Sequence, residues 1–472
     1  MINKMECFTK TSSVIILMAS FLMIHASNAD MLRYVKHKHS DDEPKQEWDY
    51  VEVRSYAHMF YWLYYTTDPA GYEHVPLVMW LQGGPGGSST GFGNFAELGP
   101  LDIMLKPRNT TWLSAASLLF VDNPVGAGFS YVDNDDAYTT NVDTIARDLL
   151  VLLKTFFLEK ATQFQSIPFF IFSESYGGKM TAAVSDVLYE AITTGDIKCN
   201  FKGFAMGDSW ISPIDSTLGW GPYLYTNSLV DLSGYLEVNS SLEKVAQAIQ
   251  MGNWTQATEA WGSAQNVVEL KSNGVNFYNI LQWGGSEPAI EGEGLLDRMT
   301  KRMLGKLHND PLSELMNGPI RRKLRIIPEH VVWGGQSDMV FQKQTEDFMK
   351  PVTDIVNSLI MNTPLKVVVY SGQLDLIVET TGTEAWVYRL DIAEDFRKAT
   401  RIPVLNPSTK LTSGFVQSAK NFSFYWILDA GHMVSIYHTY CAPNHRQRRR
   451  ELADNYAIGS VPIVVSTALH IE

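Results

Sequence analysis

Ser175 lies in a stretch whose residue types could support nucleophilic catalysis. Residues 167–172 read Ile-Pro-Phe-Phe-Ile-Phe, an almost unbroken apolar run typical of a buried parallel strand. Residues 173–178, Ser-Glu-Ser-Tyr-Gly-Gly, then turn sharply, and a helix pattern starts at Lys179. A strand that breaks into a helix through small-x-Ser-x-Gly exposes the central serine at the edge of a sheet. Ser175 is therefore the candidate nucleophile, with the positive end of the helix behind it.

A serine nucleophile needs a base and a carboxylate that orients the base, and later strand ends supply both. Asp375 follows the predicted strand 366–371, and His432 follows the predicted strand 424–428. A lone histidine at a strand end more often has a structural role, but the chain order serine, acid, histidine is that of the α/β-hydrolases. We expect His432 to take the proton of Ser175 while Asp375 fixes the tautomer of the imidazole.

A glycine-rich loop follows an earlier predicted strand, residues 75–81. It reads Gln82-Gly-Gly-Pro-Gly-Gly-Ser-Ser89. Glycine lets bare backbone N–H groups approach a reacting oxygen, so we expect the amides of Gly84 and Tyr176 to form an oxyanion hole. A phosphate-binding loop is the competing interpretation, and the missing Gly-Lys-Ser/Thr disfavours it.

The elements that must position these groups alternate between strands and helices. Two leading strands are expected within 48–65, further strands at 117–122 and 204–208, a helix at 141–159, and helices at 242–263 and 295–317. This order, together with the chain order of the three catalytic candidates, predicts an α/β-hydrolase fold, with a mostly parallel central sheet, helices on both faces and an inserted helical cap. The predicted divisions are a core at 46–212 and 331–434, with the cap at 213–330.

The two ends of the chain read differently from the core. Residues 1–29 carry a basic start, an apolar stretch and small residues before Asp30, as a signal peptide does, and residues 30–45 read as a flexible arm. No later stretch is long enough to span a membrane. Asn-x-Ser/Thr acceptors for glycosylation occur at Asn109, Asn239, Asn253 and Asn421, and Cys199 and Cys441 could pair. We expect a secreted or lysosomal protein.

Net charge and missing motifs exclude several classes of function. The formal net charge of −13 argues against a nucleic-acid-binding protein. The chain has neither His-Glu-x-x-His nor Gly-x-Gly-x-x-Gly after a strand, so no metal or organic cofactor is expected. Whether the chain pairs as a homodimer is left open.

Several motifs together resemble the serine carboxypeptidase family, and most of all its retinoid-inducible branch. They are Trp80-Leu-Gln-Gly-Gly-Pro-Gly-Gly-Ser-Ser89, Glu97-Leu-Gly-Pro100, Asp122-Asn-Pro-Val-Gly-Ala-Gly-Phe-Ser-Tyr131, Ser173-Glu-Ser-Tyr-Gly-Gly178, Gly207-Asp-Ser-Trp210, Gly372-Gln-Leu-Asp-Leu-Ile-Val378 and Gly431-His-Met433. The resemblance implies removal of single residues from the free C-terminus of peptides, usually at acid pH. It also implies that Gln82, Gly83, Glu97 and Glu174 bind the terminal carboxylate of the substrate. Two carboxyl groups can do so only when protonated.

The chain departs from the family pattern at three places, one of which is Gly87, where many members have a cysteine. Gln82 stands where most members have asparagine, and after Val434 the closing amphipathic helix of the family is not recognisable. Residues 435–472 are therefore predicted to be a divergent tail. An acyltransferase on the same scaffold and a catalytically silent carboxypeptidase-like protein are the alternatives to a peptidase.

Overall fold

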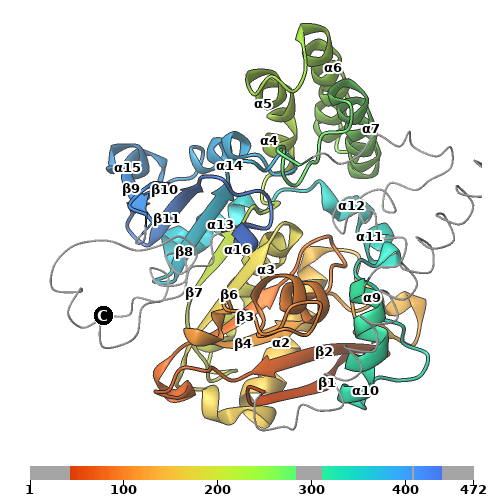
Figure 1. Ribbon diagram of the computed structural model, residues 1–472, viewed down its shortest axis with the longest axis vertical. Helices are drawn as coiled ribbons and strands as arrows, with labels where there is room; N and C mark the ends of the chain where they lie inside the picture. Colours follow the sequence, from red (N-terminus) through yellow and green to blue (C-terminus); the bar gives the residue numbers. More distant parts are fainter. Residues whose placement is uncertain (1–42, 283–310, 407–408, 438–472) are drawn as a thin grey trace, which may run out of the picture.

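A single mixed sheet runs through the protein. The computed structural model describes residues 43–282, 311–406 and 409–437. Its strands are β1 Gln46–Arg54, β2 Ala57–Tyr64, β3 Leu77–Leu81, β4 Ser117–Val121, β5 Tyr131–Val132, β6 Pro168–Glu174, β7 Asn200–Gly207, β8 Lys366–Gly372, β9 Ile402–Leu405, β10 Thr412–Ala419 and β11 Phe422–Ile427. The order is β1-β2-β4-β3-β6-β7-β8-β11-β10-β9, with β5 beside β2 (Figure 1). The middle strands β4, β3, β6, β7, β8 and β11 are mutually parallel. The predicted α/β-hydrolase fold is confirmed.

Helices cover both faces of this sheet. They are η2 Tyr72–His74, η3 Ser89–Leu98, η4 Trp112–Ser114, η5 Asp135–Ala137, α2 Val142–Thr155, η6 Phe156–Lys160, η7 Thr162–Phe164, α3 Tyr176–Thr193, α4 Pro213–Leu218, α5 Trp220–Thr226, α6 Leu232–Gln250, α7 Trp254–Ser272, α9 Pro311–Leu315, η8 Met316–Ile320, α10 Arg321–Leu324, α11 Asp338–Lys343, α12 Thr345–Phe348, α13 Thr353–Asn362, α14 Thr380–Val387, α15 Ala393–Lys398 and α16 Val434–Tyr437.

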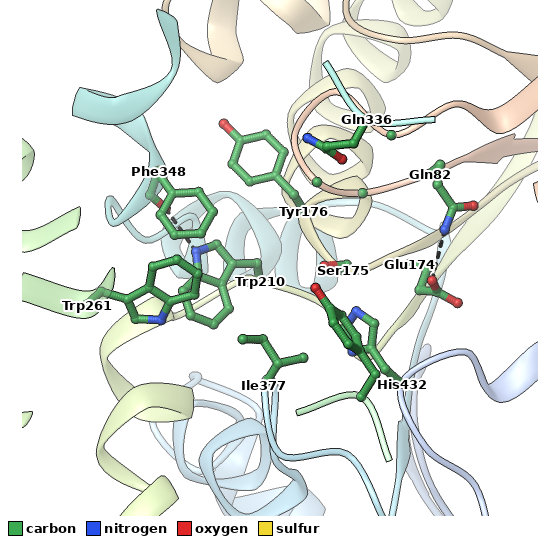
Figure 2. Close-up of a pocket in the computed structure, with 14 residues that line it drawn as sticks. Gln82, Glu174, Ser175, Tyr176, Trp210, Trp261, Gln336, Phe348, Ile377 and His432 are labelled. Atoms are coloured by element: carbon green, nitrogen blue, oxygen red, sulfur yellow. Dashed lines mark hydrogen bonds between the residues drawn. The ribbon is translucent and has the colours of Figure 1, made fainter. Parts of the chain in front are cut away.

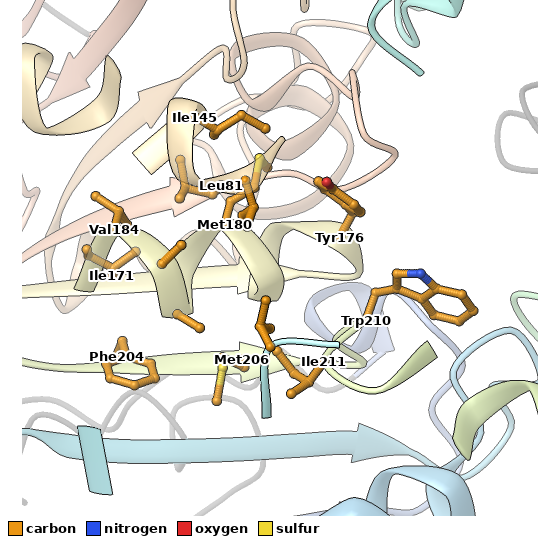
Figure 3. Packing of buried hydrophobic residues seen from close by; sticks show 14 of the residues in the cluster. Leu81, Ile145, Ile171, Tyr176, Met180, Val184, Phe204, Met206, Trp210 and Ile211 are labelled. Carbon is orange, nitrogen blue, oxygen red and sulfur yellow. The ribbon is translucent and has the colours of Figure 1, made fainter. Parts of the chain in front are cut away.

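The alternation of side chains along β3 shows why its apolar run is continuous. Leu77, Met79 and Leu81 join the core under α2 and α3, while Val78 and Trp80 join a second core under η3. Figure 3 shows the first core, where Met180 of α3 lies near Leu81 of β3 and Ile145 of α2. A strand covered on both faces needs apolar residues at every position, since neither side meets water.

The described part of the segment between β7 and β8 is mostly helical, and α5, α6 and α7 stand away from β1 and β2 in Figure 1. The prediction of one helix at 242–263 is wrong, because α6 ends at Gln250 and α7 begins at Trp254. Gly252 has φ 69°, and the Asn253 side chain accepts a hydrogen bond from the Gln256 amide, so it caps α7. The predicted helix 295–317 lies mostly outside the described residues. The division at 213 and 330 stays a prediction.

Candidate active site

Main-chain hydrogen bonds hold Ser175 in its turn. Ser175 has φ 61° and ψ −129°, a conformation that is costly for a residue with a side chain. Its N–H donates to the Gly207 carbonyl at 3.0 Å, and its carbonyl accepts from the amides of Gly178 at 3.0 Å and Trp210 at 2.9 Å. The helix starts at Tyr176 and not at the predicted Lys179, since Ser175 itself is the cap. The turn therefore fixes the serine at the carboxyl end of β6.

The glycine-rich loop lies directly against this turn. A Cβ on Gly83 would come within 2.5 Å of the Ser175 Cβ and 2.9 Å of the Tyr176 nitrogen, so only glycine fits there. Gly84 follows with φ 113°, and Gln336 covers it, donating to the Pro85 carbonyl at 2.5 Å. Ser175, Tyr176, Gly83 and Gly84 consequently line one cleft.

His432 and Asp375 are in hydrogen-bond contact at the carboxyl ends of β11 and β8. His432 Nδ1 lies 2.8 Å from Asp375 Oδ2, and both side chains are almost completely buried. Asp375 Oδ1 accepts from the amides of Ile377 at 3.0 Å and Val378 at 3.4 Å. Burial raises the pKa of Asp375, and these hydrogen bonds oppose the rise. Burial also lowers the pKa of His432 to about 4, so the imidazole is neutral at mildly acid pH.

Two buried glutamates and Gln82 lie beside this group. The Gln82 amide donates to Glu174 Oε1 at 2.9 Å and accepts from Trp80 Nε1 at 2.8 Å. Burial raises the pKa of Glu97 to about 7, although hydrogen bonds from Ser435 and Gln82 oppose the rise. Burial also raises the pKa of Glu174 well above its ordinary value, with the charge of Glu97 as the next cause. The pair therefore holds protons at mildly acid pH.

The cleft has two unlike ends, as Figure 2 shows. Gln82 and Glu174 lie together on one side of Ser175 and His432, while the rings of Trp210, Trp261 and Phe348 lie on the other side. The cleft encloses about 630 Å³ of empty space, part of it open to solvent. One end thus offers acidic hydrogen-bond donors, and the other offers an apolar wall.

The sequence patterns did not predict much of this lining. Trp261 comes from α7, Phe348 from α12 and Tyr278 from a loop, and no motif marks any of them. Ser435 was assigned to the divergent tail, yet it lies in α16 and its hydroxyl donates to Glu97 Oε2. The tail therefore begins inside the site, and only its residues from 438 onward lie outside the described chain.

The glycosylation acceptors differ in their surroundings. Asn109 and Asn253 are exposed, and Asn239 is half-buried on α6. The Asn421 amide nitrogen donates to the carbonyls of Ile360, Thr363 and Leu365 at 2.9–3.2 Å. A glycan on that nitrogen would replace one of its hydrogens, which disfavours Asn421. Cys199 is buried, and Cys441 lies outside the described residues.

A buried ion pair supports the elbow from behind. Lys179 Nζ lies 3.0 Å from Asp347 Oδ2, and the Tyr176 hydroxyl donates to the same carboxylate at 3.2 Å. The Lys179 side chain is fully buried and that of Asp347 is 7% exposed. The pair ties the first turn of α3 to α12, and so holds one wall of the cleft.

Replacing Lys179 by methionine is expected to lower the free energy of unfolding by about 3–5 kcal/mol, because the buried Asp347 would lose the positive charge that pairs with it. Urea unfolding measures this. Lys350→Met is the matched control, since the Lys350–Glu346 pair at 3.2 Å is largely exposed and should contribute at most about 1 kcal/mol. Equal losses in the two variants would contradict a special role for Lys179.

No group of three or more His, Cys, Asp or Glu side chains that could hold a metal ion occurs in residues 43–282, 311–406 and 409–437. Over the same ranges, no helix is both long and apolar enough to cross a membrane.

Comparison with known proteins shows the family of this chain. The profile described as Serine carboxypeptidase matches residues 38–448. The retinoid-inducible serine carboxypeptidase of Mus musculus is 53% identical over 403 residues, covering 84% of this chain and 89% of its own. Serine carboxypeptidase-like 51 of Arabidopsis thaliana is 41% identical over 447 residues, covering 90% and 95%. Among solved structures, the prohormone-processing carboxypeptidase Kex1 of Saccharomyces cerevisiae has the same fold, with a TM-score of 0.71 at 20% identity over 87% of this chain and 90% of its own. The chain therefore belongs to the serine carboxypeptidase family and is a hydrolase of that type.

Proposed function

We propose that this enzyme hydrolyses the last peptide bond of peptides with a free C-terminus through Ser175, His432 and Asp375. The observation that carries the proposal is the 2.8 Å contact between His432 Nδ1 and Asp375 Oδ2 beside Ser175, in a cleft that Glu174 lines with buried Glu97 next to it. A nucleophile with its base and orienting acid supports acyl transfer. The glutamates supply a reason to select a terminal carboxylate.

The proposed reaction has two halves. His432 Nε2 takes the proton of the Ser175 hydroxyl as Ser175 Oγ attacks the scissile carbonyl carbon, and the amides of Gly84 and Tyr176 stabilise the oxyanion. The C–N bond then breaks, and the imidazolium gives its proton to the leaving amine. A water molecule, deprotonated by His432, attacks the acyl-enzyme, and its collapse returns the proton to Ser175.

The ionisable groups favour acid pH for this reaction. With the pKa of His432 lowered to about 4, the base is free to accept a proton at pH values above about 4. With the pKa of Glu97 raised to about 7, its carboxyl group stays protonated below about pH 7 and can donate to a substrate carboxylate. The expected working range lies between these two values.

Such a range suits lysosomes or acidic extracellular fluid, reached through the predicted signal peptide at 1–29. Exposed Asn109 and Asn253 are the acceptors whose surroundings fit a glycan.

Blocked dipeptides with a free acid or an amide at the C-terminus test the substrate class. At about pH 5 we expect the acid to be cleaved about 100-fold faster than the amide, because the amide cannot accept the hydrogen bonds of Glu97 and Glu174 in the same way. Chromatography of the products measures both rates. Equal rates would contradict a carboxypeptidase, and transfer of the acyl group to an added amine in preference to water would indicate an acyltransferase.

A further inference from the structure

Asp208 is a buried carboxyl group that the mechanism above does not use. It follows β7 within Gly207-Asp-Ser-Trp210 and is completely buried. Its N–H donates to the Tyr370 carbonyl at 2.9 Å. Its Oδ1 accepts from the Gly372 amide at 2.8 Å and the Ser371 hydroxyl at 3.2 Å. These contacts fix the carboxyl group at the carboxyl end of β8, next to the loop that carries Asp375.

The second oxygen of Asp208 has a different environment. Asp208 Oδ2 is buried and has no N–H or O–H donor among the described residues. The carboxyl group of Asp375 lies within hydrogen-bonding reach of Asp208. Two ionised carboxylates in contact repel each other, whereas one proton between them makes a hydrogen bond. A buried oxygen left without that proton would also be costly.

The remaining contacts indicate which of the two carboxyl groups carries the proton. Asp375 Oδ2 faces His432 Nδ1 at 2.8 Å, and Asp375 Oδ1 accepts from the amides of Ile377 and Val378. Each of these contacts favours an ionised Asp375. Asp208 Oδ2 has no comparable donor, so the neutral acid is the better state for Asp208.

We propose that Asp208 is a positioning residue, which as a neutral carboxylic acid donates a hydrogen bond from Oδ2 to the carboxylate of Asp375. The inference rests on the proposed roles of Asp375 and His432. The hydrogen bond would hold the Asp375 carboxylate toward His432 Nδ1 and keep it ionised at acid pH, where carboxylates begin to protonate.

Electrostatics around Asp208 agree with this assignment. Burial raises the pKa of Asp208 well above its ordinary value, with the charge of Asp375 as the next cause, while His432 lowers it. A negative charge on Asp208 would also raise the pKa values of Glu174 and Tyr370. A neutral Asp208 therefore adds no second negative charge to that of Glu97 beside Glu174.

The test uses the full-length protein and a fluorophosphonate, which reacts with an activated serine and needs no terminal carboxylate. Its rate of reaction with Ser175 is measured from about pH 4 to about pH 8 in the wild type, Asp208→Asn and Asp208→Leu. Asparagine tolerates the φ of 39° at this position and can donate from Nδ2 to Asp375. The pH profile of Asp208→Asn should therefore match that of the wild type. Leucine cannot donate. We expect the acid limb, the fall of the rate as His432 becomes protonated, to move up by about one pH unit, with a fall of about twofold at pH 5.

Two outcomes would overturn the proposal. An ionised Asp208 would raise the pKa of the imidazole, so Asp208→Asn would then move the acid limb to lower pH. A merely structural Asp208 would leave the profile of a folded Asp208→Leu variant unchanged, with only its melting temperature lowered.

Infrared difference spectra keep the proposal testable if the leucine variant does not fold. Subtracting Asp208→Asn from the wild type near neutral pH should leave the carbonyl band of a carboxylic acid, and a carboxylate band in its place would overturn the assignment. This readout does not depend on peptide hydrolysis. If peptides are not cleaved while the infrared and labelling results hold, the peptidase proposal fails and the inference about Asp208 survives. If peptides are cleaved but neither result appears, the inference alone fails.

Discussion

Replacing Ser175 by alanine is expected to lower kcat/KM for peptide hydrolysis by about 10⁵–10⁶-fold, the loss seen when the nucleophile of a serine hydrolase is removed. The acyl-enzyme cannot form without Ser175 Oγ, and the oxyanion hole alone provides only a small residual acceleration. Release of the terminal residue from a blocked dipeptide at about pH 5 measures the loss. The fluorophosphonate should also no longer label the protein.

This substitution removes the nucleophilic oxygen and leaves the turn around it intact. The hydrogen bonds described for Ser175 run through its N–H and its carbonyl, and alanine keeps both. Ser173→Ala is the matched control, because it removes a buried hydroxyl two residues away that does not line the cleft. If the wild type and Ser175→Ala were both folded and equally inactive, the chain would be a silent carboxypeptidase-like protein. Activity that persists in Ser175→Ala would indicate a different nucleophile.

The elements that present the site could be predicted because their patterns are local. The apolar run 167–172 became β6, and the leading strands expected at 48–65 became β1 and β2. His432 and Asp375 were expected together because both follow parallel strands, whose carboxyl ends meet at one edge of a sheet. Their contact at 2.8 Å follows from that order of strands.

The walls of the site could not be predicted because they depend on contacts between distant segments. Trp261 and Phe348 are 87 residues apart in the sequence, and the packing of α7 against α12 brings them together. Their ring centroids lie 4.8 Å apart. Each residue alone reads as an ordinary apolar residue of a helix. Ser435 was missed for the same reason, since nothing near it in sequence indicates Glu97.

Asp208 shows what a sequence pattern could have revealed. Gly207-Asp-Ser-Trp210 was noted as a motif without a function, although a carboxylate at the end of a buried strand needs a partner. Only the structure shows that the neighbouring carboxyl group belongs to Asp375. At Asn421 the sequence shows a glycosylation motif, and the structure argues against its use. The three carbonyls that accept from its amide nitrogen are distant in sequence and could not be predicted.

The Michaelis constant for peptides should rise with pH, and Glu97 should be the cause. Below about pH 7 its carboxyl group is protonated and, in the proposed role, donates a hydrogen bond to the substrate carboxylate, because burial raises the pKa of Glu97 to about 7. Above that value the proton is lost, and the donor becomes a negative charge that repels the substrate. We expect KM to rise about tenfold for each pH unit above 7, while kcat changes little.

Glu97→Gln separates this cause from others, because glutamine donates a hydrogen bond at every pH. We expect its KM to vary less than about threefold between about pH 5 and about pH 8, with the exposed Glu52→Gln as a control that keeps the wild-type rise. If Glu174 dominates instead, Glu97→Gln will keep the wild-type rise and Glu174→Gln will remove it. A wild-type KM that stays flat over this range would exclude both glutamates as donors to the substrate. The terminal carboxylate would then have to be bound by Gln82 and the backbone of the glycine-rich loop, and the buried pair would have a structural role.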